Sequence, residues 1–314
     1  MSGVPVFTAA QVERAVSAER AIDAVRDAFV AYTRGEWTMP PKVYVTNYPA
    51  GDFRAMPAIG GGYALLKWIN SFPGNPAHGL PTVSGVVLLS EAETGQLRAV
   101  LDAGSVTSLR TGAAAVLAAE TLARRDAGAA AVIGAGVNGL ATAKTFRARG
   151  RQVVLWDLDE TRAREAAAAI DADVAPSLAH ALAADIVVTV TPGHEIVITE
   201  GALRQGQHVS LMGADGPGKA EMAGPELERA HLFCDDWEQA SHGGELAHAV
   251  EADLVTLDDV TEIGDVLTGA AAGRLDDEEI TAFDSTGLAI QDLAIALAAY
   301  EAADDLGDLQ RLEL

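Results

Sequence analysis

Hydrophobic and polar positions in the first third of the chain change from helical to strand-like spacing. Residues 8–34 carry apolar side chains at intervals of three and four, begin with a capping box from Thr8 to Gln11, and end at Gly35. We expect one amphipathic helix there. From residue 42 to about 103, short β-type runs separated by Pro, Gly and Asn turns predict a curved, mainly antiparallel sheet. The runs are 42–48, 53–58, 63–71, 82–89 and 97–101, and a helix is expected over 105–124.

The rest of the chain alternates helices with buried strands. Apolar runs at 129–133 and 153–156 have the composition of strands buried on both faces, with an Ala-rich helix between them. Helices are then expected at 159–169, 177–183, 199–204, up to about 273 and at 288–305; strands are expected at 172–174, 185–190, 208–212, 231–234 and 281–285, and 309–314 is compatible with a further strand. This alternation predicts an α/β fold, a Rossmann-type doubly wound parallel sheet inserted in a smaller α+β domain. We expect domains at 1–122 plus 287–314 and at 123–286.

Three glycines follow the first buried run in the pattern G-x-G-x-x-G: Gly134, Gly136 and Gly139. The first permits a tight turn, the second lets the backbone approach a pyrophosphate, and the third lets the helix pack on the strand. Asp157 follows about 20 residues later, where a carboxylate binds ribose hydroxyls and repels a 2′-phosphate. The pattern predicts NAD as cofactor; the alternative is an ordinary βαβ turn without ligand. Further candidate cofactor contacts are Val137 and Asn138 in the motif, Thr111 in the preceding helix and Thr191 in a later turn.

Composition narrows the class of protein. The chain has 314 residues, 49% of them apolar, which is enough for two folded domains. A net charge of −23, spread along the chain, argues against nucleic acid and anionic membranes as partners. The one cysteine, Cys234, excludes an intrachain disulfide and makes a cysteine-based metal site implausible, so no metal is expected. There is no apolar segment of membrane-spanning length and no secretory pattern at the N-terminus, which predicts a cytoplasmic protein.

Lysine is rare in this sequence. It occurs only at Lys42, Lys67, Lys144 and Lys219. An acid-rich, lysine-poor surface resembles that of proteins from salt-loving microbes, in which salt screens self-repulsion, and predicts a halophilic source. Where surface lysine is avoided, each remaining lysine is a candidate for a specific role.

Two residues are candidates for acid–base catalysis. Lys67 lies inside the apolar run LLKWI, and burial of an ammonium lowers its pKa towards the range useful in proton transfer. The alternative is a lysine on the exposed face of the strand. Asp215 follows a predicted strand at its carboxyl end, where open α/β sheets bind ligands. The alternative is an aspartate that caps the turn-rich loop 213–218.

Four residues are candidates for binding a carboxylate substrate. Arginine binds a carboxylate with two parallel hydrogen bonds, and a fixed lysine neutralises its charge. Lys42 and Arg54 lie on adjacent predicted strands, and Arg110 lies near the start of the helix over 105–124. Each of these cations would ordinarily be a solvated surface charge. Thr82 is a weaker candidate for the same pocket.

A series of motifs in order covers nearly the whole chain: MPPKVYV, DFRAMPA, LLKWINSFPGNP, GLPTVSG, TSLRTGAA, VIGAGVNG, GADGPGKAEM, DDWEQASHGGEL and DSTGLAIQD. Together they resemble the ornithine cyclodeaminase/μ-crystallin superfamily, and within it they are most similar to the archaeal NAD-dependent alanine dehydrogenases. The resemblance implies that Lys67 is the acid/base beside the reacting carbon and Asp215 the catalytic aspartate. It implies that Lys42 and Arg54 hold the substrate carboxylate with Arg110 nearby. It also implies a homodimer joined through the sheet of the first domain, which is then the substrate-binding and dimerisation domain.

The activity implied by the resemblance is the reversible, NAD-dependent oxidative deamination of L-alanine to pyruvate and ammonia. Cyclodeaminases that resemble this chain carry an acidic residue two positions before Met-Pro, where it receives the side-chain ammonium of ornithine. Here that position is Arg54, which would repel a second ammonium, and Lys42 replaces an expected arginine. Two alternatives stay open: an ornithine cyclodeaminase that forms proline and ammonia with NAD recycled, and a ketimine reductase or NAD(P)-dependent small-ligand binder of the μ-crystallin type.

Overall fold

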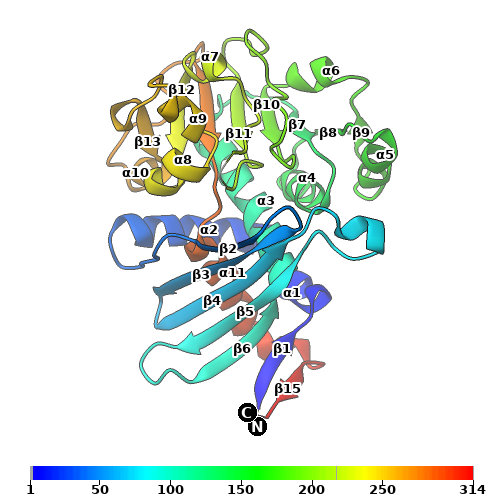
Figure 1. The fold of residues 1–314 in the computed structure, drawn as a ribbon, viewed down its shortest axis with the longest axis vertical. Coiled ribbons are helices and arrows are strands. Elements are labelled where there is room, and N and C mark those ends of the chain that lie inside the picture. Colours follow the sequence, from blue (N-terminus) through cyan, green and yellow to red (C-terminus); the bar gives the residue numbers. More distant parts are fainter. Residues whose placement is uncertain (1–2, 217, 314) are drawn as a thin grey trace. The chain divides into compact units, whose positions relative to one another are not determined.

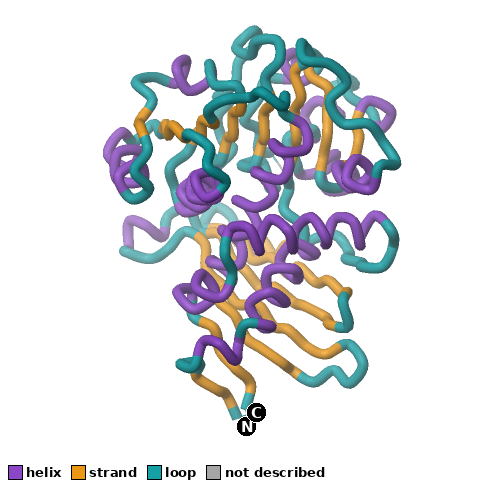
Figure 2. Tube along the Cα trace, turned by 180° about the vertical axis from the view of Figure 1, so that it is seen from behind, coloured by secondary structure: helices purple, strands orange, loops and turns teal. Residues whose placement is uncertain are grey.

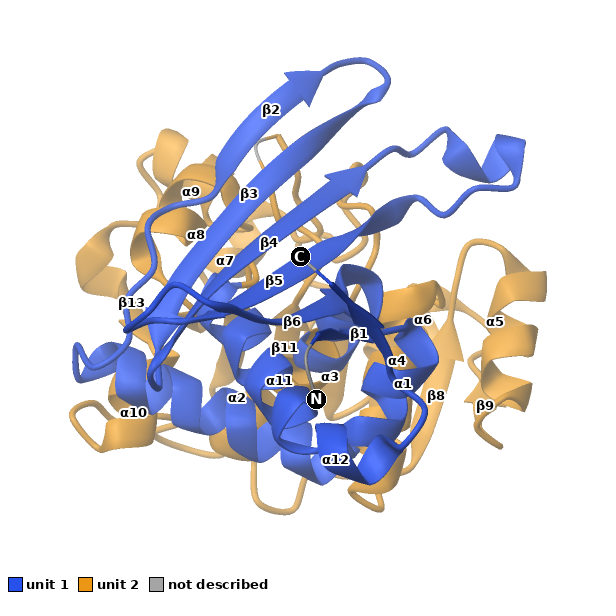
Figure 3. Cartoon of the chain, turned by 90° about the horizontal axis from the view of Figure 1, so that it is seen from below, with its two compact units in different colours: residues 1–110, 288–314 blue, residues 111–287 orange. Residues whose placement is uncertain are grey.

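The computed structural model describes residues 3–216 and 218–313, so Pro217 of the predicted loop and Leu314 of the predicted terminal strand lie outside the described residues. The chain divides into two compact units (Figure 3). Unit 1 comprises residues 1–110 and 288–314, and unit 2 comprises residues 111–287. The division falls within helix α3 (Ala103–Leu122), which was expected over residues 105–124.

Unit 1 contains a seven-stranded sheet in the order β15-β1-β6-β5-β4-β3-β2. Its strands are β1 (Val4–Phe7), β2 (Val43–Asn47), β3 (Gly51–Gly60), β4 (Tyr63–Ser71), β5 (Val83–Glu91), β6 (Leu97–Asp102) and β15 (Gln310–Leu312). All neighbours are antiparallel except β1 and β6, so the predicted mainly antiparallel sheet is confirmed. The C-terminal segment returns to this sheet, because β15 lies beside β1 (Figures 1 and 2).

The helices of unit 1 are α1 (Ala9–Ala15), α2 (Ala18–Thr33), the 3₁₀ helix η1 (Asn75–His78), α11 (Ala289–Glu301) and α12 (Ala303–Leu306). The expected single helix over 8–34 is wrong in one respect, because it is divided into α1 and α2. Val16 is extended, and the Ser17 hydroxyl accepts a hydrogen bond from the Arg20 amide, which starts a second helix. Helix α11 packs on β3, β4 and α2, so one face of the sheet is covered by helices.

Unit 2 is a parallel sheet of eight strands in the order β13-β12-β14-β11-β10-β7-β8-β9. Its strands are β7 (Ala130–Ile133), β8 (Val153–Trp156), β9 (Asp173–Val174), β10 (Ile186–Thr189), β11 (His208–Leu211), β12 (Ala230–Cys234), β13 (Val260–Glu262) and β14 (Ile280–Asp284). Its helices are α4 (Val137–Ala148), α5 (Glu160–Ala168), α6 (Leu178–Leu182), α7 (Gly224–Leu227), α8 (Trp237–Gly243), α9 (Ala247–Glu251), η2 (Leu257–Asp259) and α10 (Ile263–Thr268). The doubly wound parallel sheet predicted from the alternating pattern is confirmed.

One predicted helix of unit 2 is absent. Residues 199–204 form one turn at 200–201 and otherwise irregular chain, and the buried carboxylate of Glu226 accepts hydrogen bonds from the Gly201 and Leu203 amides at 2.6 and 2.9 Å. Gly201 also has a φ of +74°, which lies outside the right-handed helical region. A distant side chain therefore takes the amides that a helix would have used.

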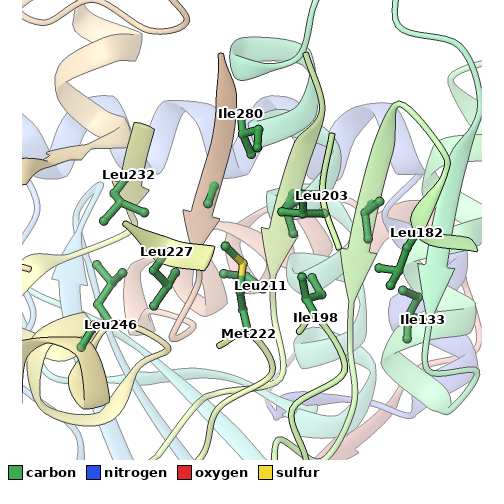
Figure 4. Packing of buried hydrophobic residues seen from close by; sticks show 14 of the residues in the cluster. Ile133, Leu182, Ile198, Leu203, Leu211, Met222, Leu227, Leu232, Leu246 and Ile280 are labelled. Carbon is green, nitrogen blue, oxygen red and sulfur yellow. The ribbon is translucent and has the colours of Figure 1, made fainter. Parts of the chain in front are cut away.

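The core of unit 2 lies among the central strands. Ile133, Leu211 and Leu232 come from β7, β11 and β12, and they belong to one cluster of buried residues with Met222 and Leu246 (Figure 4). The strands are buried on both faces, as their continuous apolar runs predicted. This packing fixes the carboxyl ends of the strands, from which the loops of the candidate site leave. Within residues 3–216 and 218–313, no helix is both long and apolar enough to cross a membrane.

Candidate active site

Lys67 points to the helix-covered face of the unit 1 sheet. Along β4 the buried residues alternate, and the Lys67 side chain is only 1% exposed. Its Nζ lies 2.6 Å from Oδ2 of Asp292 on α11 and donates to the Thr107 hydroxyl at 3.4 Å. Arg110 lies on the other side of Asp292, with its Nε 3.7 Å from Oδ1. The prediction that Lys67 is buried is confirmed, and the alternative of an exposed lysine is wrong.

The surroundings of Lys67 decide its charge near neutral pH. Burial lowers the pKa of Lys67 from 10.5 to about 8; the Asp292 carboxylate opposes this shift, and the Arg110 and Arg54 guanidinium groups add to it. A lysine with this pKa exchanges a proton near neutral pH, as a general acid or base requires.

Arg54 lies on the same buried face, on β3. It is 8% exposed, and its Nε donates to Oδ1 of Asp52 at 2.7 Å. Its guanidinium carbon is 5.4 Å from the centre of the Tyr44 ring. Three cationic side chains, those of Lys67, Arg54 and Arg110, therefore lie on this face beside the buried carboxylates of Asp52 and Asp292. Guanidinium groups bind a carboxylate through two parallel hydrogen bonds, so this face has the chemistry to bind one.

The two other predicted substrate-binding residues lie just outside strands. Lys42 directly precedes β2 and Thr82 directly precedes β5, and both side chains are half-buried. Their roles stay predictions.

The glycine turn has the geometry of a dinucleotide site. Gly134 follows β7 with a φ of +103°, and a Cβ there would lie 2.6 Å from the Val190 carbonyl oxygen. A Cβ on Gly139 would overlap the Gly134 carbonyl, so the helix packs on the turn only without a side chain. A Cβ on Gly136, by contrast, would meet nothing within 4 Å, which leaves open space at the start of α4. The residues present therefore fit a pyrophosphate at this helix N-terminus.

The other predicted cofactor contacts of this βαβ unit lie at the start of α4 and after β8. Val137 is 78% exposed at the first position of α4, and Asn138 follows it half-buried. Asp157 directly follows β8, and its carboxylate accepts hydrogen bonds from the Ala135 and Asp159 amides at 2.7 and 2.8 Å. Arg162, which sequence reasoning missed, lies 3.4 Å from the same carboxylate.

Thr191 and Asp215 leave neighbouring strands of unit 2. The chain reverses its strand order between β7 and β10, and ligands of open α/β sheets bind at such switch points. Thr191 is half-buried in the loop after β10. Asp215 lies in the loop after β11 with 32% of its side chain exposed, and Lys219 Nζ donates to it at 2.6 Å. Thr111, by contrast, is 2% exposed within α3.

Sequence reasoning missed several buried acids, among them Asp52, Glu221, Glu245 and Asp292. Asp292 had a signal, because it interrupts the apolar run LAIQDLAIALAAY just as Lys67 interrupts LLKWI. For the others, the partners are backbone amides or a nearby arginine, which leave no pattern in the chain. Across the described ranges 3–216 and 218–313, no three His, Cys, Asp or Glu residues are grouped to hold a metal ion.

Comparison with known proteins confirms the resemblance seen in the motifs. An alanine dehydrogenase from Archaeoglobus fulgidus is 43% identical over 312 residues, which cover 95% of this chain and 94% of that protein. A solved archaeal alanine dehydrogenase, described as a dimer with bound NAD, has a TM-score of 0.93 and 40% identity and covers 98% of each chain. An ornithine cyclodeaminase from Brucella suis is 30% identical over 274 residues, 84% of this chain and 75% of that protein.

The sequence model of one family matches nearly the whole chain, from residue 4 to residue 306. On this match and on the relative that is 43% identical, the chain belongs to the ornithine cyclodeaminase/mu-crystallin family.

Proposed function

We propose that this protein is an NAD-dependent alanine dehydrogenase, which reversibly converts L-alanine to pyruvate and ammonia. The observation that carries the proposal is the buried cluster around Lys67, which combines a proton-exchanging amine with the guanidinium groups of Arg54 and Arg110. The 43% identity to an alanine dehydrogenase supports the same activity. We assign substrate binding to residues 1–122 plus 287–314 and dinucleotide binding to residues 123–286.

Each part of the chemistry has a proposed residue. Lys42, Arg54 and Arg110 hold the substrate carboxylate, with Thr82 beside them. Neutral Lys67 takes a proton from the substrate ammonium, and NAD, when bound, would accept the hydride of the α-carbon, which leaves a protonated imine. Asp215 takes a proton from the water molecule that adds to the imine carbon, while the protonated Lys67 orients that water. Lys67 returns its proton to the nitrogen, the C–N bond breaks, and the hydroxyl proton leaves with the ammonia as ammonium, which gives pyruvate.

Arg54 supports a small, uncharged substrate side chain. Its guanidinium lies on the same buried face as Lys67, and it adds to the lowering of the pKa of that lysine, of which burial is the main cause. A second substrate ammonium, as in ornithine, would be repelled by the Arg54 guanidinium. We therefore prefer alanine to ornithine as substrate.

The function is tested directly by a coupled measurement. With alanine and NAD in concentrated salt, we expect NADH and pyruvate to form in equal amounts, with NADP much less effective because Asp157 repels its 2′-phosphate. The comparison of NAD with NADP is informative because Arg162 lies beside Asp157. If Arg162 released Asp157, its guanidinium would attract the 2′-phosphate of NADP. Proline formed from ornithine without net NADH would replace the proposal by the cyclodeaminase. The same assay in dilute buffer tests the proposed halophilic source, because full activity there would count against it. Cytoplasmic localisation stays a prediction.

We also propose a homodimer that forms through the open face of the unit 1 sheet. A cross-strand row on this face consists of Val43, Ala55, Trp68 and Val86 from β2, β3, β4 and β5. Val43 is 55% exposed, Val86 41% and Trp68 39%, so apolar side chains face outwards together. The related archaeal enzyme is described as a dimer, which supports the same assembly here.

The dimer is tested by sedimentation. Trp68→Glu places a charge in the centre of the apolar row. In analytical ultracentrifugation we expect the wild type to sediment as a dimer and this variant as a monomer. Leu275→Glu is the matched control, because Leu275 is 69% exposed in unit 2 and lies outside this sheet. A wild type that sediments as a monomer would contradict the proposal.

A further inference from the structure

A buried carboxylate joins the loops that follow β10 and β11. Glu221 is 0% exposed, and each of its two oxygens is bonded to a different loop. Oε1 accepts a hydrogen bond from the Thr191 amide at 2.8 Å. Oε2 accepts one from the Gly213 amide at 2.8 Å and one from the Thr189 hydroxyl at 2.6 Å. The carboxylate therefore links two neighbouring strand ends through both of its oxygens.

The fit around this carboxylate is close. A Cβ on Gly213 would lie 2.5 Å from Oε1 of Glu221 and would overlap the Thr191 carbonyl oxygen. The two loops approach each other only because residue 213 has no side chain, and the carboxylate is held in the space between them. The loop spacing is thus set by one side chain and has little freedom to change.

A second buried acid holds the backbone of Glu221 itself. The Glu245 carboxylate accepts hydrogen bonds from the Glu221 amide at 2.9 Å and from the Met222 amide at 2.7 Å. The Glu221 carbonyl in turn accepts the Val197 and Ile198 amides at 2.8 and 2.9 Å. Hydrogen bonds therefore fix both the main chain and the side chain of Glu221. Providing partners for the buried amides would not by itself require both.

We propose that Glu221 is a positioning residue, which aligns Thr191 with the loop that carries Asp215. This inference rests on the proposed function, in which Thr191 contacts the cofactor and Asp215 acts on the substrate. Asp215 is two residues beyond Gly213, so a shift of the Gly213 amide moves it directly. Misplacement of a reacting group by about 1 Å lowers rates by up to about 100-fold. A clamp across both loops keeps such shifts small.

The test compares two buried glutamates of unit 2. Glu221→Gln keeps one acceptor oxygen but presents an NH₂ group to the other loop, so one of the two loop bonds is lost. We expect kcat for alanine oxidation to fall about tenfold or more and NADH binding, followed by nicotinamide fluorescence, to weaken. Glu226→Gln is the control: Glu226 is also 0% exposed and bonds two backbone amides, but those are Gly201 and Leu203, and its other partner is the Arg229 guanidinium. It should lower the Tm comparably and leave kcat and NADH affinity unchanged.

A lower Tm in Glu221→Gln with kcat and NADH affinity as in the wild type would overturn the proposal. If this variant does not fold, Thr189→Val removes one hydroxyl donor at nearly constant volume, and it should change kcat and NADH affinity in the same direction by a smaller factor. If the wild type binds NADH but does not oxidise alanine, the proposed function fails. The NADH dissociation constants of Glu221→Gln and Glu226→Gln then still decide whether the clamp exists.

Discussion

Lys67→Met should abolish alanine oxidation, with kcat lowered by about 1000-fold, because it removes the only buried amine of the cluster around Asp292 among the described residues. Methionine has a similar length and no proton to exchange, so the shape of the site is largely kept. NADH formation from alanine and NAD measures the loss, and NADH binding should be unchanged. Lys144→Met is the matched control, because Lys144 has an exposed side chain on α4. Activity retained within tenfold in Lys67→Met would exclude the proposed role.

The same substitution leaves the Asp292 carboxylate without its nearest cation. Removing one partner of a buried ion pair destabilises a protein by about 3–5 kcal/mol. We therefore expect a lower Tm for Lys67→Met and recovery of much of that loss in Lys67→Met/Asp292→Asn, which removes the remaining charge. Recovery of stability without recovery of activity separates the catalytic role of Lys67 from its structural pairing.

Several features of this protein could be predicted from the sequence because their signals are local. Runs of buried strands and the glycine turn are encoded locally, because the strand pattern and the glycines lie within a few residues of one another. The parallel sheet, the mainly antiparallel sheet and the burial of Lys67 could therefore be predicted. The return of the C-terminal segment as β15 was also compatible with its short run of residues.

What could not be predicted depends on contacts between residues far apart in the chain. The helix expected at 199–204 is absent because the Glu226 side chain captures two amides there. The clamp at Glu221 bonds backbone amides at 191 and 213, which no residue pattern reveals. Asp292 interrupts an apolar helix, but only the fold shows that its partner is Lys67. Sequence therefore indicates which residues are unusual, whereas structure shows which of them act together.

Asp292→Asn should move the pH dependence of alanine oxidation to lower pH. The reaction requires neutral Lys67, so the rate rises with pH as this lysine, with a pKa of about 8, loses its proton. The Asp292 carboxylate favours the protonated amine, and its removal lowers the pKa of Lys67 further. We expect the rising limb of kcat/KM to shift down by about one pH unit or more. The substrate ammonium titrates identically with every variant, so a difference between variants reports on the enzyme.

Arg110→Gln should shift the pH dependence of alanine oxidation in the opposite direction, which makes the pair of variants a specific test. The Arg110 guanidinium lowers the pKa of Lys67, so its removal should shift the same limb to higher pH, in addition to raising the KM for alanine. A general loss of structure would not produce shifts in opposite directions from two charged neighbours of the Lys67 amine. Shifts of the same sign, or none, would mean that the rising limb belongs to a group other than Lys67. Opposite shifts would show that Asp292 and Arg110 together set the proton affinity on which the proposed catalysis depends.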